Sequence, residues 1–167
     1  MNSARTWIEH LNLTPHPEGG YFREVYRSDG VIPESALPDG FSGDRSFATS
    51  IYFLLQGSDF SAFHRIKQDE LWHFHDGVPL TVHVISADGN YSELKLGLDP
   101  ENGYLPQGVV KAGDWFAASL DEPTGFSLVG CTVAPGFDFS DFEMPTKELL
   151  TSLFPQHAEL VKSLTRS

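Results

Sequence analysis

From Ser46 to Val133 the chain is a series of short segments rich in β-branched and aromatic residues. Turn-forming residues such as Asp76-Gly77 and Ala112-Gly113 separate one segment from the next. The expected strands are residues 47–55, 61–66, 70–75, 80–85, 91–96, 109–111, 114–118 and 126–133. Many short strands at regular spacing predict an all-β sandwich or barrel.

The regions on either side of this series predict one more strand and short helices at the two ends. Residues 21–27 have strand character and follow a flexible glycine pair. Ser3 and Thr146 are suited to cap an N-terminal and a C-terminal helix. Residues 28–45 have loop composition, and we expect this long loop to cover a pocket or to reach a partner subunit. All 167 residues are expected to form one domain.

Composition excludes several classes of partner. The chain has 23 acidic and 11 basic residues, and a formal charge of −12 repels nucleic-acid phosphates and anionic lipid surfaces. Cys131 is the single cysteine, which rules out an intramolecular disulfide and a thiolate zinc cluster. No apolar run is long enough to span a bilayer. We therefore expect a cytoplasmic protein that binds a small molecule and neither nucleic acid nor membranes.

The segment from His64 to His75 has an unusual density of titratable groups. It contains three histidines and two acids within twelve positions. Because side chains alternate along a strand, Glu70 and Trp72 are expected to face the barrel interior, and His73 the other side. A carboxylate that faces an apolar interior must be hydrogen-bonded, metal-bound, paired with a cation or raised in pKa. The segment therefore marks the expected pocket, although a purely structural ion pair of Glu70 is an open alternative.

The same residues resemble a known superfamily. The spacing of His64, Glu70 and Gly77 resembles the first cupin motif, and residues 111–116 resemble the second. Six segments together resemble the cupin subfamily of predicted sugar epimerases (DUF985 type): residues 17–24, 49–55, 63–65, 69–73, 113–116 and 131–139. This resemblance implies a double-stranded β-helix, or jelly-roll barrel, that is usually a homodimer.

The resemblance also shows where this chain departs from metal-binding cupins. Those proteins supply two histidines and a glutamate from the first motif and a histidine from the second. Here only His64 and Glu70 match, and Phe116 stands at the position of the last histidine. Two ligands are too few for a catalytic transition metal. We expect no metal and no other cofactor, and a metal-dependent oxygenase would need an additional ligand such as His73.

The favoured function is metal-independent isomerisation or epimerisation of a carbohydrate or nucleotide-sugar-like ligand. Sugar-nucleotide 3,5-epimerases on the same barrel use a histidine base and a tyrosine acid. By that resemblance His64 is the expected base, Glu70 acts beside it, and Tyr21 is the candidate acid, with Tyr26 and Tyr52 as alternatives. The alternative from another class is a module that binds or senses a small ligand without chemistry.

The remaining candidates are ligand-binding residues. The expected set is Arg23, Tyr52, Arg65, Trp72, His73, Phe116 and Cys131. The arginines suit an anionic group, and the aromatic rings suit a sugar face. Phe137, Phe139 and Phe142 are expected to bury against the barrel, at the pocket mouth or against a second subunit. Four histidines have no partner visible in the sequence and are expected to be structural: His10, His16, His83 and His157.

Overall fold

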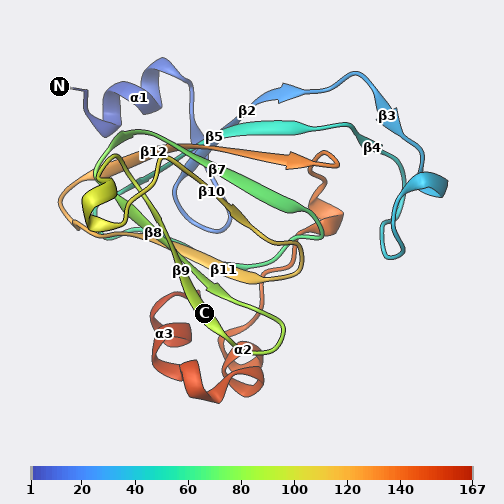
Figure 1. The fold of residues 1–167 in the computed structure, drawn as a ribbon. Coiled ribbons are helices and arrows are strands. Elements are labelled where there is room, and N and C mark those ends of the chain that lie inside the picture. The colour runs from blue at the N-terminus through green and yellow to red at the C-terminus, as the bar shows by residue number, and fades with distance from the viewer. Residues whose placement is uncertain (1, 167) are drawn as a thin grey trace.

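The computed structural model describes residues 2–166, and two antiparallel sheets enclose its main core (Figure 1). The six-stranded sheet has the order β1 (Thr14–Pro15), β2 (Tyr21–Arg27), β5 (Thr49–Gln56), β12 (Phe126–Ala134), β7 (Asp69–Gly77) and β10 (Gln107–Val110). The four-stranded sheet has the order β6 (Phe60–His64), β11 (Trp115–Leu120), β8 (Leu80–Ile85) and β9 (Tyr91–Leu96). This arrangement confirms the predicted all-β jelly-roll barrel.

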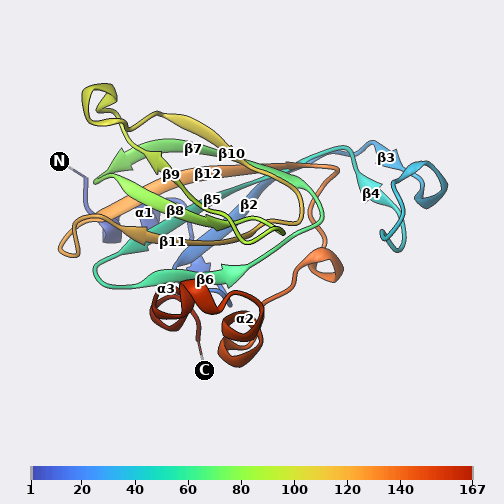
Figure 2. The ribbon, with the colours of Figure 1, turned by 60° about the horizontal axis from the view of Figure 1, so that its bottom comes forward.

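Short helices cover the two outer faces (Figure 2). Helix α1 (Ala4–His10) begins after Ser3, whose hydroxyl accepts a hydrogen bond from the Thr6 amide, and it packs on the six-stranded sheet. Helices α2 (Lys147–Leu153) and α3 (Ala158–Ser163) pack against the four-stranded sheet. The 3₁₀ turns are η1 (Glu34–Ala36), η2 (Pro100–Asn102), η3 (Phe139–Asp141) and η4 (Pro155–His157). In residues 2–166 no helix combines the length and the apolar character that crossing a membrane requires.

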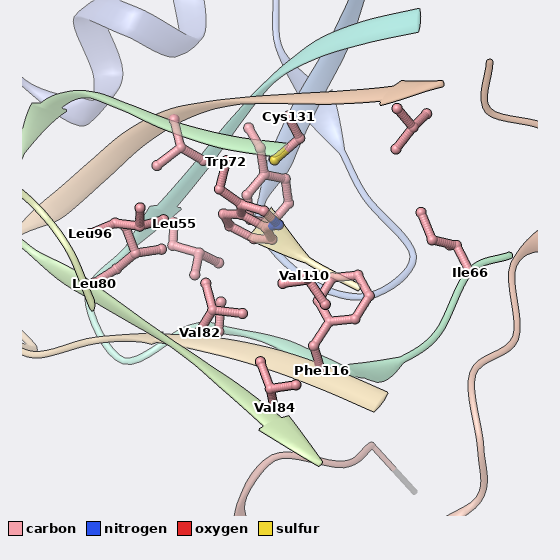
Figure 3. Close-up of a cluster of buried hydrophobic side chains, with 14 residues drawn as sticks. Leu55, Ile66, Trp72, Leu80, Val82, Val84, Leu96, Val110, Phe116 and Cys131 are labelled. Carbon is pink, nitrogen blue, oxygen red and sulfur yellow. The ribbon is translucent and has the colours of Figure 1, made fainter. Parts of the chain in front are cut away.

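The main core lies between the sheets and includes Trp72, Phe116 and Cys131 (Figure 3). Each of these side chains is nearly or fully buried. Trp72 and Cys131 are direct cross-strand partners on β7 and β12, so both point to the same face of the sheet. This core fills one part of the barrel and forms the base of the cavity described below.

The long segment between β2 and β5 is more ordered than its composition indicates. It contains a small hairpin of β3 (Val31–Ile32) and β4 (Arg45–Ser46) that projects from the body of the molecule (Figure 1). Its base is fixed by Arg45, whose guanidinium donates two hydrogen bonds of 2.8 Å to the carboxylate of Asp141. Both side chains are buried, so this ion pair ties the hairpin to η3.

A β-bulge in β2 changes which side chains of that strand face the interior. Glu24 pairs with Ile51 of β5, and Arg27 pairs with Thr49, while the register shifts between Glu24 and Tyr26. Without the bulge, residues 24 and 27 would lie on opposite faces of the sheet. With it, Glu24 and Arg27 face the same side and line the same cavity.

Candidate functional site

A cavity of about 350 Å³ opens at one end of the barrel. Its lining consists of His16, Glu18, Phe22, Glu24, Arg27, Thr49, Ile51, His64, Ile66, Glu70, Cys131, Val133, Phe137, Asp138, Phe139 and Phe142. These residues come from the loop before β2, from the strands of the six-stranded sheet, from β6, and from the segment after β12. The cavity therefore joins parts of the chain that are far apart in sequence.

His64 is held in one orientation inside this cavity. Its Nδ1 lies 2.7 Å from the carbonyl oxygen of Ala62, and since a carbonyl only accepts, Nδ1 carries a proton. Its ring lies between those of Phe116 and Phe142, with centroids 4.1 and 5.3 Å away. The imidazole thus has a fixed tautomer at Nδ1 and presents Nε2 to the rest of the site.

The Nε2 atom of His64 lies 3.0 Å from Oε2 of Glu18. Burial alone would lower the pKa of His64, but the charge and hydrogen bond of Glu18 outweigh it and raise that pKa. Conversely, burial alone would raise the pKa of Glu18, and the charge of His64 lowers it. Both shifts favour an imidazolium paired with a carboxylate.

The loop that carries Glu18 is built into the barrel. The Ala62 amide donates to the Glu18 carbonyl at 2.8 Å, which places the loop beside β6. Gly19 follows with a φ of 113°, and a Cβ at this position would lie 2.0 Å from the Phe60 carbonyl oxygen. Only glycine fits there, and this close approach is what brings the Glu18 carboxylate to His64.

Glu70 is the second carboxyl in the cavity lining, and it is partly buried. It lies on β7 opposite Val133 of β12 and Val110 of β10. Burial raises the pKa of Glu70 to about 7, the charge of Glu18 adds to this effect, and the charge of His64 opposes it. Glu70 is thus poised to exchange a proton near neutral pH.

Cys131 lines the cavity next to Glu70. Burial raises the pKa of its thiol well above the ordinary value, and the charges of Glu70 and Glu18 add to that effect. The thiol therefore stays protonated at neutral pH and is a weak polar neighbour of the Glu70 carboxyl.

The mouth of the cavity combines aromatic rings with an ion pair. Phe137, Phe139 and Phe142 follow β12 and contact one another edge to face. All three line the cavity, and Phe137 and Phe142 also pack against the barrel core, whereas Phe139 is about half exposed. The Arg27 guanidinium donates to both oxygens of Glu24, at 2.8 and 2.9 Å.

Several sequence-predicted site residues lie elsewhere, and the expectation that they line the pocket was wrong. On β2 the side chains of Phe22 and Glu24 line the cavity, so those of Tyr21 and Arg23 point to the opposite face of the sheet. Tyr21 packs in the cluster under α1, and Arg23 donates to the Leu11 carbonyl. Tyr52 is the cross-strand partner of Arg23 and shares its outward face.

Four more predicted site residues lie outside the cavity lining. Arg65 lies beyond the end of β6 and pairs with Glu143 at 2.7 Å, outside the cavity. His73 lies on the face of β7 opposite to Glu70, as the strand alternation predicts. Trp72 and Phe116 face the interior, but they are core residues behind the cavity wall. Of the ten predicted site residues, His64, Glu70 and Cys131 lie in the lining.

Sequence reasoning missed Glu18, Glu24 and Arg27, and it gave His16 a structural role although His16 lines the cavity. Glu18 lies in the segment 17–24 that resembles the cupin subfamily, but the sequence alone indicates no role for it. The available signal was the run from Glu18 to Gly20, because an acid next to two glycines is typical of a tight turn at a site. No pattern in the sequence predicts the bulge that brings Arg27 to the cavity.

The donor set does not fit a transition metal of the kind that cupins bind. Among residues 2–166 there is no group of three His, Cys, Asp or Glu side chains arranged to hold a metal ion. Both ring nitrogens of His64 are engaged, one with the Ala62 carbonyl and one with Glu18. A metal would need a free lone pair on one of these nitrogens.

Comparison with known proteins agrees with this fold. A family model described as "Cupin superfamily (DUF985)" matches residues 5–145. The chain belongs to this cupin family. The match includes every residue of the cavity lining, so the cavity is part of the family's common region.

Three similar proteins extend over most of the chain. "Uncharacterized protein YML079W" of Saccharomyces cerevisiae is 30% identical over 159 residues, which cover 84% of this chain and 74% of that protein. The crystal structure of protein SO0799 from Shewanella oneidensis is 42% identical, with a TM-score of 0.88 and 99% of both chains covered. A hypothetical protein from Leishmania major is 38% identical, with a TM-score of 0.90, 99% of this chain covered and 100% of that one.

A more distant likeness concerns the fold alone. A variant of oxalate decarboxylase from Bacillus subtilis is 16% identical, with a TM-score of 0.54, and the likeness covers 90% of this chain but 36% of that one. At this level of identity, function is not transferred, because cupin barrels support many unrelated activities.

Proposed function

We propose that this cavity is the active site of a metal-independent isomerase or epimerase that acts on a small carbohydrate-like ligand. The observation that carries the proposal is the presence of Glu18, His64 and Glu70 together in the lining of one cavity. Titratable groups cost free energy when they are buried without a partner, and groups with strongly shifted pKa values gather at catalytic sites.

The geometry favours Glu70 as the base, with His64 and Glu18 as a fixed charge pair beside it. With a pKa of about 7, Glu70 is available as a carboxylate at neutral pH and retains the basicity needed to accept a proton. His64 is an imidazolium because Glu18 stabilises its charge. The sequence suggests His64 as the base, but its contacts with Ala62 and Glu18 leave neither ring nitrogen free for that role.

Tyrosine has no part in this proposal. None of the five tyrosines lines the cavity within the described part of the chain, so the structure does not support the expected tyrosine acid. The aromatic rings at the mouth suit the apolar face of a sugar, and the carboxylates suit its hydroxyl groups.

A direct test is proton exchange between solvent and a panel of free aldoses and ketoses, followed by proton NMR in heavy water. We expect the enzyme to exchange hydrogen at carbon next to the carbonyl of at least one sugar. Glu70→Gln should reduce that rate by about 10²- to 10⁴-fold, the usual contribution of a general base. Arg23→Gln is the matched control, since Arg23 lies on the outer face of the same sheet.

A Glu70→Gln protein that is folded and exchanges at the wild-type rate would rule out Glu70 as the base. Binding of sugars without any exchange would instead support the module that binds a ligand without chemistry.

A further inference from the structure

His16 has a single tautomer that leaves one N–H free. The backbone amide of Glu18 donates a hydrogen bond of 3.1 Å to Nδ1 of His16, so Nδ1 has no proton. Burial lowers the pKa of His16, which keeps the ring neutral at pH 7. A neutral imidazole with a bare Nδ1 carries its proton on Nε2.

This Nε2–H group has no hydrogen-bond acceptor among residues 2–166. The ring is nevertheless fixed, because it contacts Phe22 edge to face at 4.5 Å and stacks on Phe139 at 6.4 Å. Nε2 is not among the buried polar atoms that lack a partner, so a water molecule or a ligand in the cavity can accept its hydrogen bond. Since His16 lines the cavity, the acceptor is expected to be an atom of the ligand.

The charges of the lining exclude an anionic ligand. Four carboxyl groups line the cavity, those of Glu18, Glu24, Glu70 and Asp138. Among the described lining residues the one arginine or lysine is Arg27, whose guanidinium is already bonded to Glu24, Ser46 and the Phe137 carbonyl. A phosphate or a carboxylate would meet negative charge and no unoccupied guanidinium.

We propose that the ligand is an uncharged hydroxycarbonyl compound, such as a free ketose or aldose, whose carbonyl oxygen accepts a hydrogen bond from Nε2–H of His16. Nε2–H of His16 can only donate a hydrogen bond. A carbonyl oxygen, which can only accept, therefore fits it better than a hydroxyl group. The inference rests on the proposed function, which needs a carbonyl next to the carbon that loses its proton.

In the reaction, the Glu70 carboxylate removes the proton from the carbon next to the carbonyl. The C–H bond breaks, an O–H bond forms on Glu70, and the electron pair moves onto the carbonyl oxygen. His16 then stabilises the negative charge that develops on that oxygen, as a neutral donor placed in advance. Return of the proton to carbon restores Glu70, so no oxidant or further reactant is needed.

The test compares three matched probes: D-xylulose, its alditol xylitol, which lacks the carbonyl, and D-xylulose 5-phosphate. Dissociation constants are measured by calorimetry or ligand-observed NMR on the full chain. We expect D-xylulose to bind at least about fivefold more tightly than xylitol, the scale of one net hydrogen bond, and also more tightly than the phosphorylated ketose. L-erythrulose with erythritol, and D-fructose with its alditols, extend the comparison to shorter and longer ketoses.

Variants at position 16 assign the preference to one hydrogen bond. His16→Phe keeps an aromatic ring but has no donor, and it should abolish the preference for ketose over alditol. His16→Gln places an amide N–H near the position of Nε2 and should restore part of it. His10→Phe is the control, since His10 lies on α1 outside the cavity lining.

Equal binding of ketose and alditol, tighter binding of the phosphorylated ketose, or no binding of any ketose would overturn the inference. An unchanged preference in a folded His16→Phe protein would do the same. These outcomes are separate from the proposed function: selective ketose binding without proton exchange refutes only the catalysis, and exchange on an anionic sugar refutes only the ligand class.

Discussion

At the scale of single residues, the site depends on two carboxyl groups that line the same cavity and differ in their pKa values. Glu18 faces the His64 imidazole and is stabilised as a carboxylate. Glu70 lies opposite Val110 on the neighbouring strand, and burial raises its pKa to about 7. The surroundings of each group, rather than its chemical type, separate their pKa values, and this separation gives one protein both a base and a charge partner.

The raised pKa of Glu70 makes the stability of the protein depend on pH. Its pKa is about 7 in the folded protein and 4.5 for an ordinary glutamate side chain in water, so the folded state holds the proton more tightly. The stabilisation is complete below about pH 4.5 and is lost as pH rises through 7. Between pH 4.5 and 8 the Glu70 contribution to unfolding free energy should fall by roughly 3 kcal/mol.

Glu70→Gln should remove this dependence, because glutamine does not titrate. The measurement is denaturant unfolding of both proteins across that pH range, with the difference between them plotted against pH. A difference that is constant with pH would show that the pKa of Glu70 is not raised.

At the scale of elements, much of the barrel follows from alternation and turn chemistry, and much of the site does not. The strand at residues 80–85 was predicted with its observed bounds, and so was the one at 91–96. Both strands end at strong turn residues, which explains the accuracy. Thr146 caps the C-terminal helix by accepting from the Leu149 amide, also as predicted.

The parts of the site that could be predicted lie on regular strands. Alternation along β7 correctly places Glu70 toward the interior and His73 away from it. The parts that could not be predicted depend on contacts between distant segments: the loop with Glu18 meets β6 through the Ala62 amide, and the Arg27 position depends on a bulge. Because side chains alternate along a strand, Tyr21 and Arg23 lie on the face opposite to Phe22. With Phe22 toward the interior, this rule places both of them outside the pocket.

The buried pair Arg45 and Asp141 makes a prediction about η3 and the hairpin. Asp141→Asn leaves the guanidinium of Arg45 buried without its counter-charge, which should destabilise the protein by about 3 kcal/mol. It should also loosen η3, which carries Phe139 of the cavity mouth. The measurement is chemical denaturation, and Glu143→Gln, which breaks the half-exposed pair with Arg65, is the control.

The control should lose less than about 1 kcal/mol. Equal losses in the two variants would contradict a special role for the buried pair.

At the scale of the whole molecule, the hairpin and the adjoining part of β2 remain available for a partner. Strand β1 pairs only with residues 21 and 22 of β2, so within the described residues one edge of β2 is open from Arg23 to Arg27. Four large apolar side chains between residues 25 and 47 are about half exposed: Val25, Tyr26, Val31 and Phe47. Exposed apolar groups beside an open strand edge favour association.

We therefore predict that two copies of the chain associate through this region as a homodimer. Light scattering coupled to size-exclusion chromatography should give twice the chain mass. Tyr26→Asp should shift the protein toward monomer, whereas Leu98→Asp, at an exposed apolar residue far from β2 in sequence, should leave the mass unchanged. A monomeric wild-type protein at micromolar concentration would refute the prediction.

The bulge at Val25 has a consequence for how relatives of this protein are compared. The pairing of Glu24 with Arg27 at the cavity mouth is determined by the number of residues between them, as well as by their identities. In a relative that lacks one residue here, an arginine aligned with Arg27 would turn to solvent, and the rim of its cavity would carry one more unopposed acid. Gaps in an alignment at this strand therefore carry information about ligand charge, even where every aligned residue is identical.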